Sequence, residues 1–558
     1  MKAHIVIVLL ILTSVSCAAG AAPGHHPPHA AIASANPQAT KAGMQILAEG
    51  GNAFDVAVAV SAALAVVEPY SSGIGGGGFW LLHVAQYHRN TMIDGREYAP
   101  GAATATMYQD KHGNVIRGLS TDGPLSAGIP GEPAALVYLN KHYGRLPLAK
   151  DLAPAIKLAR DGYRLDAMFQ RIIAERIDKL KRSPAAAAIF LDHGQVPAVG
   201  WLLKQPDLAN TLELIAKHGD AGFYRGPLAK KLVDGTRAAG GIWSLADLRD
   251  YKVKERKPLV GQYHGMKIVS APPPSSGGIV LLETLNILSG YDLAHDSHLM
   301  RKHLVIEAMR RAYRDRAEYL GDPDFVKMPI KRLISPYYAA GLRSNILADR
   351  ATPSSDLAPV TINKPESMHT THISIMDKHG NEVSATFTVN FRFGSGFVPP
   401  GTGVVLNDEM DDFVSKPGVP NGYGLVGNDA NAIAPHKRPL SSMTPTFLQT
   451  KKGQAVLGTP GGSRIISMVL LGTLDYFNGG DAKSIVSIPR YHMQYLPDVV
   501  FYEPGAFTTD EITGLEKMGY HLRQIHPYGN MQAITWDYRT GKVAAASDPR
   551  DIGAAEVK

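Results

Sequence analysis

Two alternating segments joined by a short polar turn constrain the fold of this chain more than any other feature. The first segment begins at Thr370, and the second runs from Glu382 to Asn390. Apolar and polar residues alternate in both, which is typical of strands, and Asp377–Asn381 between them has the composition of a turn. The sequence therefore predicts an antiparallel hairpin whose first strand starts at a threonine.

The register of this hairpin can be estimated from its turn. If Asp377 pairs with Glu382, Thr370 lies opposite Val389, to within one residue. Thr388 and Asn390, on either side of Val389, then flank the end of the strand that carries Thr370.

The direction of the side chains favours Thr370 over Thr371 as the nucleophile. Thr388 and Asn390 are two residues apart and so share one face, where they flank Thr370, whereas the side chain of Thr371 points to the opposite face. A threonine hydroxyl is a weak nucleophile without a neighbouring base, and the α-amine of an N-terminal threonine can be that base. Such an amine has a pKa of about 7.7–8.0 and is substantially neutral near physiological pH. The pattern indicates Thr370 as a nucleophile that chain cleavage would expose.

Charged and hydroxyl side chains elsewhere in the chain suit recognition of an amino acid. Carboxylates cluster in Leu406–Phe413, and Arg96 lies at the end of an expected strand. The guanidinium of Arg96 could bind the α-carboxylate of an amino acid, and the clustered carboxylates could bind its ammonium. Ser441 and Ser442 can add hydroxyl donors at the carboxylate end.

A glycine pair offers backbone donors. Gly461 and Gly462 come just before an apolar helix expected over Arg464–Phe477. Free N–H groups at a helix N-terminus can stabilise an oxyanion.

The remaining pattern mixes helices and strands along one large unit or two tightly merged halves. The glycine run Gly75–Gly78 lacks the Gly-Lys-Ser/Thr of a phosphate loop, so close backbone packing near an active site is the better interpretation.

The expected helices cover Lys41–Glu49, Phe54–Val67, most of Gly131–Asp250, Ile279–Leu288 after the rigid loop Ala271–Gly278, and Arg301–Leu320. Two segments, Phe79–Val84 and Thr91–Asp94, are expected to pair as strands.

The N-terminus has the pattern of an export signal. Lys2 precedes the apolar run Ile5–Leu12, which is too short to span a bilayer, and Ala19-Gly20-Ala21 is an acceptable cleavage site. The alternative is lipid modification of Cys17, the single cysteine. No Asn-x-Ser/Thr sequon occurs, which favours a bacterial envelope. The sequence thus predicts a periplasmic or secreted protein.

The charge balance argues against nucleic-acid binding. Lys and Arg total 57 against 50 Asp and Glu, a formal charge of +7, but these residues are scattered along the chain. No basic stripe with interleaved aromatics is present. We expect no nucleic-acid partner, and no metal or cofactor.

Several ordered motifs carry a resemblance to a known family. The chain resembles the γ-glutamyltranspeptidases (glutathione hydrolases) of the N-terminal-nucleophile hydrolase superfamily over nearly all of its length after the signal. The motifs that carry this similarity are Val67–Gly78, Pro272–Gly278, Glu318–Phe325, Thr370-Thr371-His372, Asn431 with Lys437–Met443, Pro460–Arg464 and Ser547–Arg550.

The resemblance implies a fold and a maturation step. The fold would be α+β, a four-layer αββα sandwich built from two subunits of one precursor. Residues 1–21 would be the signal peptide, 22–369 the large subunit and 370–558 the small subunit. Self-cleavage would fall between His369 and Thr370, and the two subunits would stay associated.

The resemblance also implies a role for each site residue. Thr370 would be the nucleophile, with Thr388 bonded to its amine. Asn390, Glu409 and Asp412 would hold the substrate ammonium. The α-carboxylate would be bound by Arg96, Ser441 and Ser442. Gly461 and Gly462 would form the oxyanion hole. Residues Pro417–Gly424 would form a lid loop, with Tyr423 as its gate.

The function implied is cleavage of γ-glutamyl amides such as glutathione, with transfer of the group to water or to an amino-acid or dipeptide acceptor. Three alternatives remain. A glutaryl (cephalosporin-type) acylase shares the architecture but has no ammonium to recognise, so Asp412 and Glu409 argue against it. A γ-polyglutamate hydrolase requires an open cleft, and the expected lid argues against that. A non-enzymatic binding protein or inactive relative is a different class, and the intact Thr370, Thr388 and glycine pair argue against it.

Overall fold

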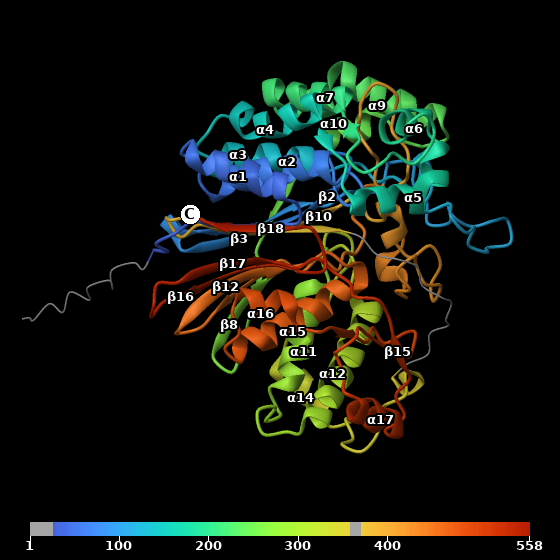
Figure 1. Cartoon of the computed structure of the whole chain (residues 1–558). Coiled ribbons are helices and arrows are strands. Elements are labelled where there is room, and N and C mark those ends of the chain that lie inside the picture. Colours follow the sequence, from blue (N-terminus) through green and yellow to red (C-terminus); the bar gives the residue numbers. More distant parts are fainter. Residues whose placement is uncertain (1–25, 358–369) are drawn as a thin grey trace, which may run out of the picture.

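The computed structural model describes residues 26–357 and 370–558 and has four layers (Figure 1). Two β-sheets lie face to face in the middle, and each carries a layer of helices on its outer face. The expected four-layer αββα sandwich is confirmed. The expected signal peptide, Cys17 and His369, the residue before the expected cleavage site, lie outside the described residues.

The first sheet has seven strands in the order β18-β1-β9-β10-β2-β3-β6. All its neighbouring pairs are antiparallel. Its strands are β1 (Ala31–Ser34), β2 (Gly77–Val84), β3 (Arg89–Gly95), β6 (Lys254–Arg256), β9 (Thr371–Met376), β10 (Glu382–Thr388) and β18 (Ala554–Val557). The hairpin expected after Thr370 is therefore β9–β10, at the centre of this sheet.

The second sheet has six strands in the order β17-β16-β12-β11-β8-β7. They are β7 (Leu259–Tyr263), β8 (Met266–Ser270), β11 (Thr446–Gln449), β12 (Gly453–Gly458), β16 (Gln532–Asp537) and β17 (Val543–Ser547). Short strands form two further small sheets, namely β4 (Tyr163–Arg164) with β5 (Leu202–Leu203), and β13 (Tyr491–His492), β14 (Val500–Tyr502) and β15 (Leu522–Gln524).

The helices before residue 251 cover the first sheet (Figure 1). They are α1 (Pro37–Ala48), α2 (Ala53–Val67), α3 (Glu132–Tyr143), α4 (Leu148–Asp161), α5 (Ala167–Lys181), α6 (Pro184–Phe190), α7 (Pro206–His218), α8 (Ala221–Tyr224), α9 (Gly226–Ala238) and α10 (Leu245–Asp250). Helix α1 begins four residues earlier than expected because Asn36 caps it, with its side-chain oxygen accepting from Gln38 N–H at 3.0 Å.

The later helices lie on the side of the second sheet. They are α11 (Gly277–Leu288), α12 (His298–Tyr319), α13 (Ile330–Leu333), α14 (Pro336–Arg343), α15 (Ile465–Phe477), α16 (Ala482–Ser487) and α17 (Thr509–Lys517). Helices α11, α12 and α15 confirm the helices expected after the proline-rich loop, over Arg301–Leu320 and after the glycine pair.

The two faces of β9 have different chemistry. Ile373 and Ile375 are fully buried in the core between this sheet and α2. Ser374 faces the second sheet and donates to Gln532 C=O at 3.1 Å. His372 shares this face, and burial lowers its pKa to about 3, so its imidazole is neutral. Thr370 continues the face that carries His372, so the expected nucleophile belongs to the layer between the sheets.

The glycine run before β2 packs directly against the strand that carries Thr388. A Cβ on Gly76 would lie 1.9 Å from Thr388 C=O, and one on Gly75 would lie 2.0 Å from Val405 C=O. Neither position can accept a side chain without moving backbone. The expectation of close backbone packing beside the site is confirmed.

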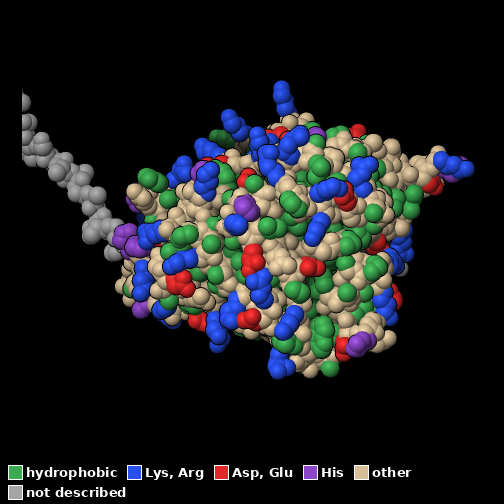
Figure 2. Space-filling model, turned by 90° about the horizontal axis from the view of Figure 1, so that it is seen from above, with side chains coloured by type: hydrophobic (Ala, Val, Ile, Leu, Met, Phe, Trp, Pro, Cys, Tyr) green, Lys and Arg blue, Asp and Glu red, His purple; other side chains and the backbone are tan. Residues whose placement is uncertain are grey.

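The surface carries charges of both signs. Lys and Arg side chains are spread over the face in Figure 2, with Asp and Glu between them. No helix within residues 26–357 or 370–558 is long and apolar enough to cross a membrane.

Candidate active site

The hairpin places Thr388 beside Thr370. The observed register pairs Phe387 with Thr371, so Thr388 lies opposite Thr370. This is one residue from the estimate that put Val389 there, within its stated margin. The Thr388 hydroxyl lies 3.4 Å from the Thr370 hydroxyl and donates to it. Thr370 itself is 6% exposed.

Thr371 points away from this group, as the alternation predicts. Its hydroxyl donates to Glu68 at 3.2 Å on the helical side of the sheet. Burial raises the pKa of the Glu68 carboxyl to about 8. The two threonines therefore lie in separate environments, and only Thr370 lines the pocket described below.

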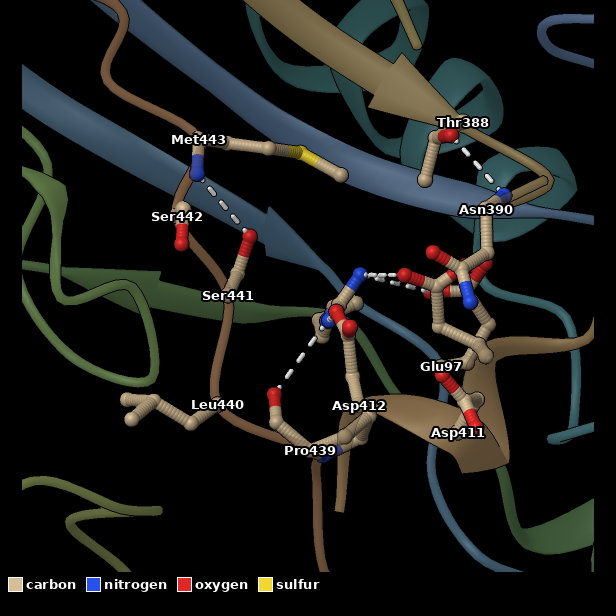
Figure 3. A network of polar contacts seen from close by, with 12 residues as sticks. Glu97, Thr388, Asn390, Asp411, Asp412, Pro439, Leu440, Ser441, Ser442 and Met443 are labelled. Atoms are coloured by element: carbon tan, nitrogen blue, oxygen red, sulfur yellow. Dashed lines mark hydrogen bonds and ion pairs between the residues drawn. The ribbon is translucent and has the colours of Figure 1, made fainter. Parts of the chain in front are cut away.

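Asn390 follows the end of β10 in a left-handed conformation, with φ of 77°. Its backbone N–H donates to the Thr388 hydroxyl at 2.8 Å, which is one of the bonds drawn in Figure 3. Its side-chain amide donates to Asp408 C=O at 2.9 Å, and its side-chain oxygen accepts from Tyr423. Asn390 thus joins the hairpin to both the acidic segment and the expected lid.

Arg96 is the centre of a buried ion cluster. Its guanidinium bonds to Glu409 and to Asp412, and its Nε donates to Pro439 C=O at 3.2 Å. Glu97 lies 3.8 Å from the same guanidinium. Arg96 and Glu97 are fully buried and Glu409 is 1% exposed.

Burial and mutual charge set the protonation of this cluster. Burial alone would lower the pKa of Arg96, but Glu409 and Asp412 reverse this and raise it above its ordinary value. Burial raises the pKa of Glu97 to about 8 and raises that of Glu409 well above its ordinary value, despite the opposing charge of Arg96. Burial also raises the pKa of Asp412. Burial thus favours the protonated acids in this cluster, while the positive charge of Arg96 favours their ionised forms.

Ser441 and Ser442 lie across the pocket from the acidic side chains (Figure 3). Met443 N–H donates to the Ser441 hydroxyl at 3.1 Å, and Arg316 donates to the Ser442 hydroxyl at 3.2 Å. Both serine oxygens accept from groups of the protein, so their hydroxyl protons can be directed elsewhere.

The glycine pair forms the turn that leads into α15. Gly461 has φ of 143° and Gly462 has φ of 53°, which are left-handed conformations that glycine adopts without strain. In the part of the chain that the structure describes, neither N–H donates to another group. These are the backbone donors that an oxyanion needs.

The expected lid residue covers this turn. A Cβ on Gly462 would lie 2.5 Å from the ring of Tyr423, which is 5% exposed. The ring stacks on Phe391 at 4.6 Å between centroids, and its hydroxyl donates to Asn390 Oδ1 at 2.5 Å. Gln494 donates to the carbonyls of Tyr423 and Gly424, at 3.3 and 3.1 Å. The segment is held closed over the glycine turn.

One small pocket brings together ten of the residues that sequence reasoning selected. Its lining comprises Arg96, Thr370, Thr388, Asn390, Glu409, Asp412, Tyr423, Ser441, Ser442 and Gly462, together with Leu425, Met443 and Ile465. Its volume is about 20 Å³, whereas two hollows of about 690 and 910 Å³ elsewhere share no residue with it. Chemistry rather than volume identifies the site. Gly461 adjoins the pocket without lining it.

Sequence reasoning missed some residues around the pocket. Glu97 directly follows Arg96 in the sequence, and Arg316 lies inside the helix expected over Arg301–Leu320. The signal for Arg316 is its spacing, since it follows the buried Ala312 and Met309 at helical intervals and so falls on the core-facing side of α12. Gln494 gave no signal, because its contact with the lid depends on the fold.

Within the same described ranges, no group of three or more His, Cys, Asp and Glu side chains could hold a metal ion. The chemistry that the pocket offers is that of hydroxyl, carboxyl, guanidinium and backbone N–H groups.

Solved structures define the class of protein to which this fold belongs. A cephalosporin acylase from Bacillus halodurans is similar with a TM-score of 0.83 and 27% identity, covering 98% of this chain and 99% of that chain. A γ-glutamyltranspeptidase from Helicobacter pylori is similar with a TM-score of 0.57 and 41% identity, covering 58% of this chain and 93% of that chain. The fold is that of the N-terminal-nucleophile hydrolases.

Sequence comparison narrows the class to a family. The family model described as gamma-glutamyltranspeptidase matches residues 39–557. Glutathione hydrolase proenzymes from Pseudomonas sp. (strain A14) and Escherichia coli (strain K12) are 46% and 42% identical, covering 89% and 93% of this chain and 87% and 90% of their own lengths. The chain belongs to the γ-glutamyltranspeptidase family.

Proposed function

We propose that this enzyme is a γ-glutamyltransferase and glutathione hydrolase that uses Thr370 as its nucleophile. It cleaves γ-glutamyl amides such as glutathione and passes the γ-glutamyl group to water or to an amino-acid or dipeptide acceptor. The names of the relatives and the family match support this activity.

One observation supports this substrate class above others. The pocket that holds Thr370 also holds a guanidinium bonded to carboxylates, in the contacts of Arg96 with Glu409 and Asp412. A γ-glutamyl group carries an α-carboxylate and an α-ammonium on one carbon. Such a zwitterion can replace the internal ion pair with two matching pairs, its carboxylate on Arg96 and its ammonium on the acids.

Each residue then has a role in binding. Arg96, Ser441 and Ser442 hold the α-carboxylate, and Asp412, Glu409 and Asn390 hold the α-ammonium. The γ-carbonyl is left to face Thr370. The buried surroundings strengthen these charged contacts, because they are little screened by water.

The reaction follows from the positions of the donors. The Thr370 amine takes the hydroxyl proton as Oγ1 bonds to the γ-carbon, and Gly461 and Gly462 N–H groups receive the developing oxyanion. The C–N bond breaks as the amine of Thr370 returns its proton to the departing amine. Water or an acceptor amine then attacks the ester and frees the Thr370 hydroxyl. Thr388 orients the nucleophile through its hydrogen bonds.

Maturation exposes the nucleophile. We place the cleavage between His369 and Thr370, which gives a large subunit of residues 22–369 and a small subunit of 370–558 that remain associated. The word proenzyme in the names of the relatives supports processing. Both subunits contribute to the pocket, since Arg96 precedes the cleavage site and the other lining residues follow it.

Two alternatives on the same fold fit less well. The similarity to a cephalosporin acylase extends over the whole chain, but the buried acids around Arg96 serve an ammonium that a glutaryl group lacks. A polyglutamate hydrolase needs an open cleft, and Tyr423 closes this one.

Export completes the proposal. The apolar segment Ile5–Leu12 and the small residues after it support removal of residues 1–21 and a periplasmic or secreted enzyme. Lipid anchoring through Cys17 is the alternative, and mass spectrometry of the mature N-terminus distinguishes the two.

The decisive experiment compares three assays of the purified protein. A γ-glutamyl anilide should release its aniline, and adding a dipeptide acceptor should raise the rate and yield a γ-glutamyl peptide. The matched glutaryl anilide, which lacks only the ammonium, should react at least about 100-fold more slowly, the loss expected for a buried charged contact. Equal rates on the two anilides would favour the acylase instead.

A further inference from the structure

Arg316 is a buried cation beside the site, and its hydrogen bonds go to neutral hydroxyls. It lies on α12, next to Tyr313, and is 5% exposed. Its Nε donates to the Ser276 hydroxyl at 2.9 Å, and a terminal nitrogen donates to the Ser442 hydroxyl at 3.2 Å. Across the described residues it forms no ion pair at contact distance, although the charge of Asp412 acts on it from further away. In contrast, Arg310 and Arg311 of the same helix are both paired with Glu307.

Such a charge is costly to bury. An ionised group taken out of water without a counter-ion loses much of its hydration energy, and hydrogen bonds to neutral hydroxyls return only part of it. Burial accordingly lowers the pKa of Arg316 to about 10, which still leaves it charged at neutral pH. A structural role alone would be served by a neutral donor at this position.

The hydrogen bond to Ser442 has a consequence for the direction of the serine proton. Because the Ser442 oxygen accepts from Arg316, its own proton cannot point back toward the guanidinium and is free to donate elsewhere. Ser441 is in the same state, since its oxygen accepts from Met443 N–H at 3.1 Å (Figure 3). Both hydroxyls line the pocket as donors. An anion in the pocket would meet two hydroxyl protons and the guanidinium of Arg96, with the charge of Arg316 behind Ser442.

We infer that Arg316 is a positioning residue for the α-carboxylate of the substrate, acting through Ser442. It fixes the Ser442 hydroxyl as a donor, polarises it, and supplies a second positive charge behind it. This inference rests on the proposed function, and it goes further by assigning the preference for a free α-carboxylate in part to a residue that does not touch the substrate.

The test compares a γ-glutamyl anilide with its α-carboxamide counterpart, which has the same γ-carbonyl and ammonium but no α-carboxylate. Arg316→Met keeps the apolar stem and removes the charge and its donors. We expect the KM for the carboxylate substrate to rise roughly 10- to 100-fold, the range of a hydrogen bond to a charged group. The kcat/KM for the carboxamide should change less than about threefold, so that discrimination between the two substrates collapses.

Two further variants separate positioning from folding. Arg316→Lys retains the charge but cannot bond to both Ser276 and Ser442 in the same fork, so discrimination should be partly restored. Arg314→Met, the same change on the same helix at a side chain that pairs with Asp315 and is 25% exposed, should leave discrimination unchanged. If the Arg316→Met protein is not cleaved into subunits, the two substrates are compared with Arg316→Lys instead.

The dependence on Ser442 is tested by a double-mutant cycle. In a Ser442→Ala background, Arg316→Met should raise the KM for the carboxylate substrate less than about twofold, because the Ser442 hydroxyl through which Arg316 acts is absent. An unchanged effect of Arg316→Met in that background would overturn the inference, and so would equal losses on both substrates. A wild-type protein inactive on every γ-glutamyl anilide would instead overturn the proposed function.

Discussion

The hydroxyl of Tyr423 donates a hydrogen bond of 2.5 Å to Oδ1 of Asn390. This bond joins the segment over the glycine turn to the hairpin that presents Thr370. The ring of Tyr423 also lies against Gly462. One side chain therefore closes the pocket above both the nucleophile and the backbone donors. Its ring is held by the hydrogen bonds of its hydroxyl to Asn390 and by stacking on Phe391.

The first prediction concerns this closure. Tyr423→Phe keeps the stacked ring but removes the bond to Asn390, so the segment should open more often. Water and acceptor amines compete for the ester on Thr370, and transfer succeeds only if the site orients the amine. We expect the transfer-to-hydrolysis ratio at fixed acceptor to fall about 2- to 10-fold, the effect of one hydrogen bond.

Product ratios measured by chromatography check this prediction. Subunit cleavage should be intact, and Tyr423→Ala should additionally admit larger γ-glutamyl substrates, including polyglutamate. Tyr337→Phe, on a side chain that is 91% exposed, is the control. An unchanged ratio in both lid variants would show that Pro417–Gly424 is only a surface connector.

The second prediction concerns maturation, and the chain supplies its own control. Thr370→Ala removes the hydroxyl beside Thr388 and should leave one full-length, folded and inactive chain. Thr371→Val removes a hydroxyl that bonds to Glu68 on the other face of the sheet, so cleavage should continue, with stability lower by about 1 kcal/mol. Mass spectrometry of the purified chains decides. Cleavage at the same bond in Thr370→Ala would exclude Thr370 as the nucleophile of processing.

The third prediction concerns Arg96. Its guanidinium bonds to Glu409, Asp412 and Pro439 C=O at once, and an ammonium cannot copy this planar fork. Arg96→Lys should therefore lower kcat/KM for γ-glutamyl substrates at least about 100-fold, or roughly 3 kcal/mol, as expected for a desolvated charged contact. Steady-state kinetics measure this loss.

Processing should survive in Arg96→Lys, because recognition of the substrate and cleavage of the chain use different groups. Arg160→Lys, at an exposed pair with Glu213, should behave like the wild type. Normal kinetics in Arg96→Lys would remove this residue from the site.

Much of the fold could be predicted because its elements have strong local patterns. The hairpin was visible in the alternation of Ile373 and Ile375 with Ser374, and α2 in an uninterrupted apolar run that is buried throughout. The hairpin register was estimated only to within one residue, because the composition of the turn does not determine whether it has four or five residues. In the structure the turn includes Asp377, whose N–H donates to Asn381 C=O at 3.0 Å, so Met376 pairs with Glu382. This puts Thr388 rather than Val389 opposite Thr370.

The candidate site was predictable in part for a different reason. Its members occur in ordered motifs, so the family resemblance selected them although Arg96 and Asp412 are far apart in the chain. Their mutual ion pair could not be predicted, because it depends on how the strand end after β3 meets the acidic segment. The same holds for Arg316 and Gln494, whose contacts with Ser442 and with the lid exist only after α12 and β13 have packed.

The last prediction concerns pH and stability. Glu382 lies at the start of β10, 5% exposed, where its carboxyl accepts from Gln454. Burial raises the pKa of Glu382 to about 8, although the bond from Gln454 opposes the shift. In the unfolded chain the same group ionises near about 4.3. Between these two values the folded state binds the proton that the unfolded state has lost.

The sign of the effect follows from this difference. Since the folded state holds more protons in that window, the free energy of unfolding falls as pH rises from about 4.3 towards 8, and above that the contribution levels off. The stabilising contribution of Glu382 is thus fully present below the lower value and lost above the higher one. Glu382→Gln has no titrating proton and keeps an oxygen that can accept from Gln454. Its stability should therefore depend less on pH, and its advantage over the wild type should grow to a few kcal/mol by pH 9, on the order set by the shift.

Differential scanning calorimetry at pH 5, 7 and 9 and a fixed scan rate measures this difference. Other buried carboxyls such as Glu68 and Asp151 titrate in the same direction, so the quantity to compare is the wild-type Tm minus the variant Tm at each pH. Glu516→Gln, at an exposed position on α17, is the matched control and should give a difference that is flat with pH. A flat difference for Glu382→Gln as well would mean that Glu382 ionises in the folded protein as readily as in the unfolded chain.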